Sequence, residues 1–435
     1  MNWNRIFRAV WMLCLGVNDM SREMKASGID WIGSIPKSWN TIKFKYLHGG
    51  MNTGEGIDKN FWSNEPTDRL FYTAGINPIR TNYEDFPEWK YTKENDLLLA
   101  RNGTPYIYIP YSNACYTDHI IRATMNASVN KRFVQYGLQC SIASVVVDSV
   151  SLATWSASLW NKQVIAWPSA EEQERIVKFL NKKEQYLNLV IEQTHASIEE
   201  YKKIKQSIIT KVVTNGIFNK RKIADSGVEW LGNIPEEWKV YRIANLYQER
   251  SESGLEELPI LTVSINTGVS DREIADEEKE RVFVRSEDRT KYKRVYPGDL
   301  VYNMMRAWQG AFGAVRVEGM VSPAYVVAKP KDGIEIDSRY MEALLRTSEA
   351  TEEMHRYSRG IVDFRLRLYW PEFKNIRICL PPIEEQREIA DYIDRKNEEI
   401  DRLIKKKEQF ISELENYKKS LIYEYVTGKK EVPEF

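Results

Sequence analysis

The sequence predicts a mixed α/β fold, of α+β type, in which two globular domains alternate with two long helices as a pseudo-twofold repeat. Two observations predict it. A charged helical stretch occurs at residues 171–214 and again at residues 384–427, and the two copies keep one constant offset from end to end. A shorter tryptophan-containing motif precedes each stretch, at residues 27–39 and 226–238. Such self-similarity indicates that one structural unit was used twice.

The composition is that of an ordinary globular protein with room for two or three domains. The 435 residues are 43% hydrophobic and 29% charged, with 62 basic and 62 acidic side chains. A balanced charge argues against a simple nucleic-acid binder, which is usually basic, although acidic helix starts dilute any local basic surface. The four cysteines show neither CxxC nor Cys/His spacing. We therefore expect no zinc site and no disulfide framework, and a cytoplasmic protein.

The amino terminus carries a short apolar run at residues 9–17, preceded by Arg5 and Arg8. The run resembles a signal-peptide core but lacks a small-residue cleavage site, and it is too short to span a bilayer. We interpret residues 1–24 as an extension upstream of a natural start at Met20 or Met24, and we expect no membrane association.

Each globular segment opens on the repeated motif. Residues 27–39 read Ser-Gly-Ile-Asp-Trp-Ile-Gly-Ser-Ile-Pro-Lys-Ser-Trp, and residues 226–238 read Ser-Gly-Val-Glu-Trp-Leu-Gly-Asn-Ile-Pro-Glu-Glu-Trp. The two motifs lie closer together in the sequence than the two helices do, so the segment between motif and helix is longer in the second half. Motif and helix are fixed, and the segment between them varies. The predicted divisions are a first domain at 25–166, a first helical spacer at 167–222, a second domain at 223–380 and a second spacer at 381–435.

Both domains are expected to be compact and rich in strand. Residues 96–101 and 299–306 look like short strands at related places. The same pattern predicts a second related pair at residues 144–147 and 324–328. Short helical pieces, such as residues 338–355, interrupt the strands.

The long helices have recognisable starts and ends. Ser169 and Glu172 form a capping box at the first start, whereas Pro382 replaces the serine in the second copy. The helices end at Gly216 and Gly428. Apolar residues recur at alternating steps of three and four, which is a heptad seam. Its members are Ile191, Ile198, Tyr201 and Ile208 in the first copy and Ile404, Ile411, Leu414 and Leu421 in the second, with Lys205 and Lys418 interrupting it. The natural partner of each seam is the other copy, although an oligomerising coiled coil is the simpler interpretation of such a seam.

Basic and amide side chains beside aromatic ones are candidates for contact with DNA. Arg, Asn and Gln pair bidentately with base edges, and basic residues position phosphates. Taken singly, each is as well explained as a solvated surface residue, and His119 or Trp308 as part of a core. The candidates are Arg101, Asn102, Thr104, His119 and Arg122 in the first domain and Asn303, Arg306, Trp308, Gln309, Tyr325, Arg359 and Arg365 in the second.

The sequence shows no catalytic chemistry of its own. It contains no GxxxxGK[ST] phosphate loop, no Asn-Pro-Pro-aromatic methylation motif, no glycine-rich cofactor loop after a strand and no HExxH. The charged run Asp-Glu-Glu-Lys at residues 276–279 is interpreted as solvated rather than as a nuclease centre, because no companion aspartate lies at a convincing strand end. We predict no catalytic residue, no metal site and no cofactor in this chain.

The arrangement after Met24 resembles the specificity subunit of a type I restriction-modification system. The resemblance rests on the paired motifs, on the helix start Pro-Pro-Ile-Glu-Glu-Gln at residues 381–386, and on Leu-Val-Tyr-Asn-Met-Met-Arg-Ala-Trp-Gln-Gly-Ala-Phe-Gly at residues 300–313. The first half departs from the pattern, because Pro168 stands alone at its helix start and the sequence after Arg101 follows a different variant.

The resemblance implies that each globular domain is a target-recognition domain that reads one half of a bipartite double-stranded DNA target. It implies that the helices pair as an antiparallel coiled coil, set the spacing and dock two methyltransferase (modification) subunits. Those partners would carry S-adenosylmethionine for adenine N6 methylation, and restriction subunits would use ATP and Mg for translocation and cleavage. The chain itself would be non-catalytic. The alternative is a coiled-coil protein-interaction scaffold without DNA specificity.

Overall fold

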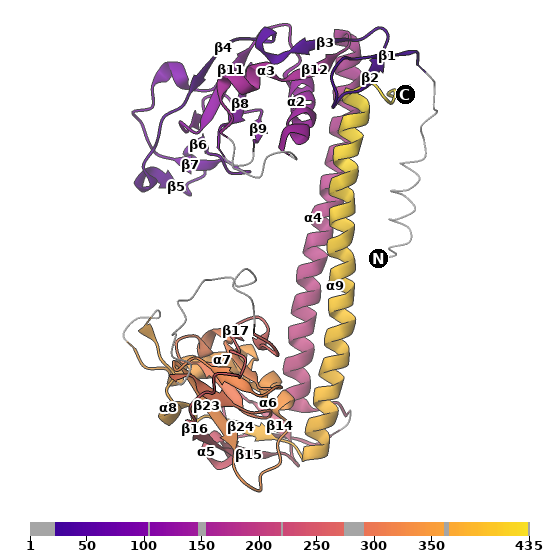
Figure 1. Ribbon diagram of the computed structural model, residues 1–435. Coiled ribbons are helices and arrows are strands. Elements are labelled where there is room, and N and C mark those ends of the chain that lie inside the picture. The colour runs from indigo at the N-terminus through magenta and orange to yellow at the C-terminus, as the bar shows by residue number, and fades with distance from the viewer. Residues whose placement is uncertain are drawn as a thin grey trace. The chain divides into compact units, whose positions relative to one another are not determined.

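The computed structural model describes residues 22–102, 105–146, 154–218, 221–273, 291–360 and 365–433. The chain divides into two compact units, Met1–Thr194 with Gln409–Phe435, and His195–Glu408. Each unit contains one globular domain and one end of a pair of long helices (Figure 1). The long helices are α4 (Ala170–Asn215) and α9 (Ile383–Val426), which confirms the two predicted helical stretches.

The first domain is built on a four-stranded antiparallel sheet with the order β4-β11-β8-β9. Alternate residues of β8 face opposite sides, as the pleat of a strand requires. Leu97 and Leu99 share a core with the helix α2, whereas Leu98 shares one with a second sheet. The strands are β4 (His48–Thr53), β11 (Ile120–Met125), β8 (Asp96–Ala100) and β9 (Ile107–Tyr108), and the helix is α2 (Lys131–Val146).

Smaller elements complete the first domain. A second sheet has the order β10-β6-β7-β5, and two-stranded ladders join β1 to β2 and β3 to β12. The bounds are β1 (Met24–Ala26), β2 (Ser34–Pro36), β3 (Asn40–Lys43), η1 (Phe44–Tyr46), η2 (Lys59–Phe61), β5 (Trp62–Ser63), β6 (Arg69–Tyr72), β7 (Ile79–Thr81), η3 (Glu88–Lys90), β10 (Cys115–Tyr116), α3 (Ala157–Lys162) and β12 (Val164–Trp167).

The second domain repeats the main sheet with the order β16-β23-β20-β21, again antiparallel. Leu300 and Tyr302 of β20 face a core shared with α6, and Val301 faces the opposite core. The strands are β16 (Tyr247–Arg250), β23 (Tyr325–Pro330), β20 (Leu300–Asn303) and β21 (Phe312–Ala314), and the helices are α6 (Ser338–Leu345) and α7 (Ser348–Tyr357).

The remaining elements of the second domain are short. They are β13 (Ile223–Asp225), β14 (Asn233–Pro235), β15 (Lys239–Arg242), α5 (Ile243–Leu246), β17 (Val263–Ser264), β18 (Gly268–Val269), β19 (Lys293–Val295), η6 (Ala307–Gln309), β22 (Gly319–Val321), α8 (Trp370–Phe373) and β24 (Arg377–Leu380). As in the first domain, a ladder of β15 with β24 leads into the long helix that follows.

The strand predictions are confirmed for residues 96–101, 299–306 and 324–328, which contain β8, β20 and most of β23. The prediction for residues 144–147 is wrong, because residues 144–146 form the last turn of α2. The run continues a helix whose Val134, Leu138 and Ile142 pack on the sheet. This tertiary contact overrides the strand propensity of a short valine run. The partner of β8 equivalent to β23 is instead β11.

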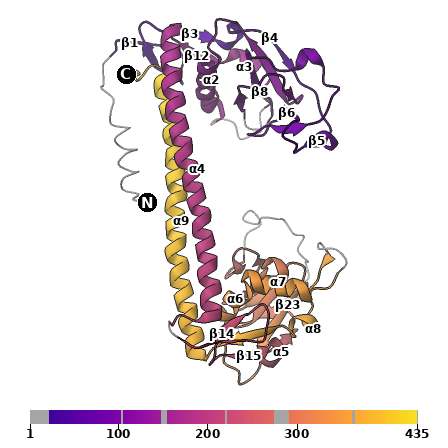
Figure 2. The same ribbon diagram turned by 180° about the vertical axis from the view of Figure 1, so that it is seen from behind.

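In each unit one end of α4 packs antiparallel against one end of α9, and Figures 1 and 2 both show the two helices side by side. In the first unit Phe179, near the start of α4, packs on Tyr425, near the end of α9, with ring centroids 4.6 Å apart. In the second unit Lys205 lies 2.8 Å from Asp401. Of the predicted seam, Ile198, Ile411, Leu414 and Leu421 are buried, and Ile191, Tyr201, Ile208 and Ile404 are half-buried.

The repeated motif packs against the start of a long helix in both units. In the first, Trp39 Nε1 donates to Glu172 Oε2 at 2.8 Å, and Arg22 Nη1 lies 2.6 Å from Glu172 Oε1. In the second, the equivalent pair is Trp238 with Glu385, at 3.1 Å. Ser169 Oγ accepts from the Glu172 backbone at 3.3 Å, but the Glu172 carboxylate is bound to the motif. The predicted capping box is therefore only half formed.

The end of α9 also contacts the first motif. Gly428 has a φ of +70°, and a Cβ there would lie 2.5 Å from the Pro36 side chain. Only glycine combines that backbone conformation with so close an approach. Within the part of the chain that the structure describes, no helix is both long and apolar enough to cross a membrane.

Candidate nucleic-acid interface

The first domain brings three predicted residues together where β8 ends. The backbone N–H of Arg101 donates to His119 O at 2.8 Å. The Asn102 side-chain nitrogen lies 2.9 Å from His119 Nδ1, and both side chains are exposed. A hydrogen bond from the Thr117 hydroxyl, with a smaller contribution from His119, lowers the pKa of the neighbouring Asp118 carboxyl. The result is an exposed polar corner with an amide, an imidazole and a guanidinium.

The segment that begins at Trp155 supports this corner through a backbone hydrogen bond. The backbone N–H of Trp155 donates to Arg101 O at 2.7 Å, and the buried Trp155 ring packs on Trp160 with centroids 4.9 Å apart. Of the predicted residues, Thr104 lies outside the described residues.

Arg122 does not join the corner. The residue is 6% exposed, and Nη1 donates to the carbonyl oxygens of Trp89 at 3.1 Å and Tyr91 at 2.9 Å. Its Nε lies 3.8 Å from the fully buried carboxylate of Asp96. A buried carboxylate needs a nearby cation. The predicted DNA contact of Arg122 is therefore not supported by its position, which gives it a structural role inside the domain.

In the second domain four predicted residues share one tight loop between β20 and β21. Asn303 O accepts from the Arg306 backbone at 2.9 Å, and Asn303 Oδ1 accepts from the Met305 backbone at 3.0 Å. Gly310 closes the loop with a φ of +90°. Gln309 is exposed next to this turn, whereas Asn303 and Arg306 are half-buried. The loop thus presents an exposed amide and a half-buried guanidinium.

Two aromatic residues flank this loop. Trp308 is half-buried and packs edge-on against His355, with centroids 5.2 Å apart. Among the described residues its indole Nε1 has no hydrogen-bond partner. Tyr325 pairs with Asn303 across β20 and β23. Burial raises the pKa of Tyr325, and the charge of the Arg306 guanidinium partly opposes that shift.

The loop is supported in the same way as in the first domain. The backbone N–H of Leu368 donates to Met304 O at 2.9 Å, and Leu368 holds the place in the second repeat that Trp155 holds in the first. Arg359 and Arg367 exchange two backbone hydrogen bonds of 2.9 Å, and Arg359 Nη2 lies 2.5 Å from Glu372. Arg365 is exposed in this segment. Each domain therefore presents a strand-end loop backed by the segment that leads towards the next long helix.

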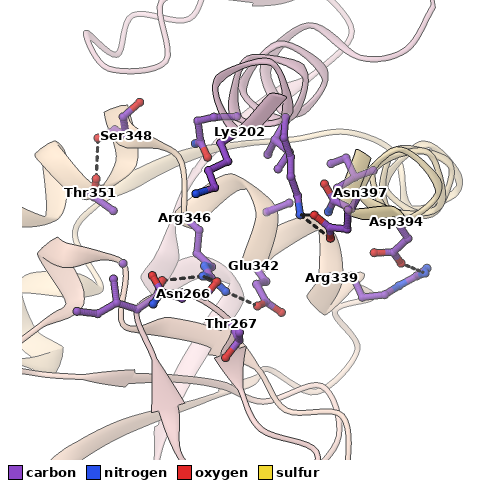
Figure 3. Close-up of a pocket in the computed structure, with 18 of the residues that line it drawn as sticks. Lys202, Asn266, Thr267, Arg339, Glu342, Arg346, Ser348, Thr351, Asp394 and Asn397 are labelled. Atoms are coloured by element: carbon purple, nitrogen blue, oxygen red, sulfur yellow. Dashed lines mark hydrogen bonds and ion pairs between the residues drawn. The ribbon is translucent and has the colours of Figure 1, made fainter. Parts of the chain in front are cut away.

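A cavity of about 800 Å³ lies beside Gln309 in the second unit (Figure 3). A turn at residues 265–268 that was not predicted from the sequence forms part of its wall. Arg346 holds this turn, because Nη2 donates to the carbonyl oxygens of Ile265 at 2.8 Å and Asn266 at 2.7 Å. The Asn-Thr-Gly run at residues 266–268 is a turn signal that could have indicated it. The cavity lining is predominantly polar and charged and includes Lys202, Asn266, Thr267, Gln309, Arg316, Arg339, Glu342 and Arg346.

The described residues contain no group of three or more His, Cys, Asp or Glu side chains that could hold a metal ion. The polar corners offer hydrogen-bond donors and acceptors at strand ends, an arrangement suited to contact with base edges and phosphates. Fold and site together define a class of protein in which two equivalent loop-presenting domains are each joined to a paired long helix.

This chain is similar in sequence to a protein of known family. No protein-family model matches the chain. The type I restriction enzyme MjaVIII specificity subunit of Methanocaldococcus jannaschii is 26% identical over 363 residues, which cover 77% of this chain and 79% of that protein. The resemblance to specificity subunits of type I restriction-modification systems is thus confirmed.

One solved structure agrees in fold, and a second is similar at a lower score. A chain from a study described as "Structural basis underlying complex assembly and conformational transition of the type I R-M system" has a TM-score of 0.60 and 14% identity, over 90% of this chain and 98% of that one. The HsdS subunit from Thermoanaerobacter tengcongensis has a TM-score of 0.44 and 14% identity, over 91% and 98%. The first of these confirms the predicted mixed α/β architecture with two domains and two long helices.

Proposed function

We propose that this chain is the DNA sequence-recognition subunit of a type I restriction-modification complex, in which each globular domain reads one half of a bipartite target. The observation that carries the proposal is the repeated strand-end loop. Arg101 and Asn102 in one domain, and Arg306 and Gln309 in the other, follow equivalent strands. Equivalent backbone hydrogen bonds, from Trp155 to Arg101 and from Leu368 to Met304, support the two loops. Two such loops with different side chains are suited to two different half-sites.

The side chains support base readout. Arg pairs bidentately with guanine, and Asn or Gln with adenine, in the major groove. Gln309 and Asn102 are exposed, so they can reach a base edge without unfolding the domain. Arg359 and Arg365, on the supporting segment, are exposed cations suited to phosphates. The balanced charge of the chain implies weak binding to DNA by this subunit alone, with phosphate contacts shared by its partners.

The partners of the proposed complex are two modification subunits and the restriction subunits. The chain is proposed to be non-catalytic and cytoplasmic, and S-adenosylmethionine, ATP and Mg would be bound by those partners. The pseudo-twofold repeat supports two identical modification subunits, because equivalent surfaces on the two halves of this chain offer equivalent docking places. The helix pair is proposed to set the distance between the half-sites.

The decisive test is a genome-wide map of N6-methyladenine in the source cell with and without this gene. Loss of one bipartite motif with a fixed spacer on deletion, and its return on complementation, is the expected result. Unchanged methylation in a cell whose modification subunits are present and active would contradict the proposal. In that case the helix pair would remain as a protein-interaction scaffold.

A further inference from the structure

A third repeat, not evident from composition or periodicity, occurs at the start of α2 in the first domain and of α6 in the second. Each of these helices packs on the main sheet of its domain. Residues 130–133 read Asn-Lys-Arg-Phe and residues 337–340 read Asp-Ser-Arg-Tyr. Asn130 Oδ1 accepts from the Phe133 backbone at 3.1 Å at the start of α2. Asp337 Oδ1 accepts from the Arg339 backbone at 2.9 Å at the start of α6. Both motifs therefore cap a helix and place an arginine in its first turn.

In the second unit this arginine joins the domain to α9. Arg339 Nη1 lies 2.8 Å from Asp391 Oδ1 and 3.2 Å from Asp394 Oδ2, while Nη2 lies 2.9 Å from Asp337. Figure 3 shows the Arg339 side chain extended to Asp394 at the edge of the cavity. Hydrogen bonds from Arg339 to Asp337 and Asp391 raise the pKa of the guanidinium. The backbone N–H of Asp337 also donates to Gln386 at 3.0 Å.

In the first unit the equivalent arginine joins its domain to α4. Arg132 Nε donates to Asn181 Oδ1 at 3.1 Å, and Nη2 to Glu184 Oε2 at 2.7 Å. The Tyr136 hydroxyl, one turn further along α2, lies 2.9 Å from Asn181 Oδ1. Asn181 occupies the position in the first long helix that Asp394 occupies in the second. Both arginines thus contact equivalent positions, Asn181 and Asp394, on the long helix that follows their domain.

Apart from the hydrogen bonds of Asp337 and Tyr136, the contacts around the two arginines are mostly apolar and do not fix a direction. In the second unit Tyr340 and Leu344 of α6 share one buried cluster with Ile389 and Ile393 of α9. Apolar burial holds two surfaces together but is non-directional, so it tolerates small rotations. A guanidinium is a rigid planar group that bonds two acceptors at set angles, which a lysine ammonium does not reproduce.

We propose that Arg132 and Arg339 are positioning residues that fix the angle of each domain on its long helix, and that they thereby restrict the spacer lengths the protein accepts. This inference rests on the proposed recognition function. The arginines do not belong to the strand-end loops, so the identity of the half-sites does not depend on them. Weakening the contacts of either arginine with its long helix lets the domain change its angle on that helix. The protein then accepts targets with neighbouring spacer lengths.

The test uses the full chain with its modification subunits and Arg132→Lys or Arg339→Lys, which keep the charge but lose the planar group. Substrates carry the native half-sites with the spacer varied base pair by base pair. We expect methylation at the native spacer to fall roughly 10-fold, about the effect of losing one charge-assisted hydrogen bond, while neighbouring spacers gain. Arg316→Lys is the matched control, because Arg316 lines the same cavity but its nearest carboxylate, at 3.8 Å, is Glu342 of its own domain.

A second readout separates this proposal from the recognition function. Spin labels at the exposed Glu352 on α7 and Glu398 on α9 report the angle within the second unit without DNA. Arg339→Lys should broaden the distance distribution, and Arg316→Lys should leave it unchanged. An unaltered distribution together with an unaltered spacer preference overturns the positioning role. If the wild-type complex does not methylate but Arg339→Lys still broadens the distance distribution, the recognition function is refuted and the positioning role of Arg339 is retained.

Discussion

Lys205 and Asp401 face each other across the helix pair of the second unit, with Nζ 2.8 Å from both carboxylate oxygens. The counterpart in the first unit is Lys418, whose Nζ lies 3.1 Å from Asn188 Oδ1. The helix repeat relates Lys205 to Lys418 and Asn188 to Asp401 by the same offset. The two lysines that interrupt the apolar seam therefore make the same cross-helix contact twice.

We predict that Lys205→Ala changes the free energy of unfolding by less than about 1 kcal/mol. The Asp401 side chain is 58% exposed and that of Lys205 28%, and ion pairs in contact with water contribute little. Chemical denaturation of the two single variants and the double variant Lys205→Ala/Asp401→Ala measures the coupling. A coupling well above this value would mean that the pair, rather than the apolar seam, holds the helices together.

Leu421→Ala serves as the contrasting variant, because Leu421 is 4% exposed in the seam. Removing a buried leucine side chain costs about 2–5 kcal/mol. Leu403→Ala is its matched control on the same helix, since Leu403 is 37% exposed.

The repeats and the helices could be predicted because their signals are local or periodic. The heptad spacing from Ile191 to Ile208 and the run at residues 96–101 needed no knowledge of distant contacts. The helix at residues 144–146 and the structural role of Arg122 could not be predicted in this way. Each depends on what lies opposite in the folded domain, the sheet in one case and the buried Asp96 in the other.

The candidate interface was predicted by residue type, and only the structure sorts its members. Asn102 and Gln309 are exposed at strand ends, whereas Trp308 is half-buried against His355. The contacts of Arg132 and Arg339 with the long helices were not predicted, because the sequence offset between these two arginines differs from the offsets of the other repeats. Their partners on the long helices are far from them in the chain, so no local pattern reports them.

The junction between motif and helix yields a second stability prediction. Glu385 is 7% exposed and accepts a hydrogen bond from Trp238 Nε1, while Arg221 forms its ion pair. Glu385→Ala leaves a largely buried guanidinium without its partner, and such losses cost about 3–5 kcal/mol. We expect a loss of about 3 kcal/mol in chemical denaturation, at the lower end of that range. Glu384→Ala, at a side chain 75% exposed, is the control and should be nearly neutral.

The strand-end loop of the second domain yields a prediction about specificity. Arg306→Ala and Gln309→Ala should each weaken discrimination at the second half-site by about 1–3 kcal/mol, the range for one bidentate base contact. The first half-site should be unaffected, since it is read by the other domain. Methylation of substrates with single changes in either half-site measures both effects.

The control for this experiment is Lys239→Ala, an exposed lysine on β15 outside the loop pair. It should leave both half-sites unchanged. Full retention of specificity by Arg306→Ala and Gln309→Ala would show that this loop only supports the sheet.

The length of the helix pair yields the last prediction. Deleting residues 189–195 from α4 and the equivalent residues 402–408 from α9 removes one heptad from each helix and leaves the seam pattern continuous. The deletion leaves Glu184 and Asp394 in place, so the contacts of Arg132 and Arg339 with the long helices remain. A heptad is about 10 Å of helix, close to three base pairs of B-DNA. We expect a preferred spacer about three base pairs different, with both half-sites unchanged, in a methylation assay on varied spacers. Deleting five residues from each helix instead turns the remainder of each seam by about 140° away from its partner and should abolish assembly of the pair. An altered half-site with an unchanged spacer would contradict the role of the helices in setting the distance.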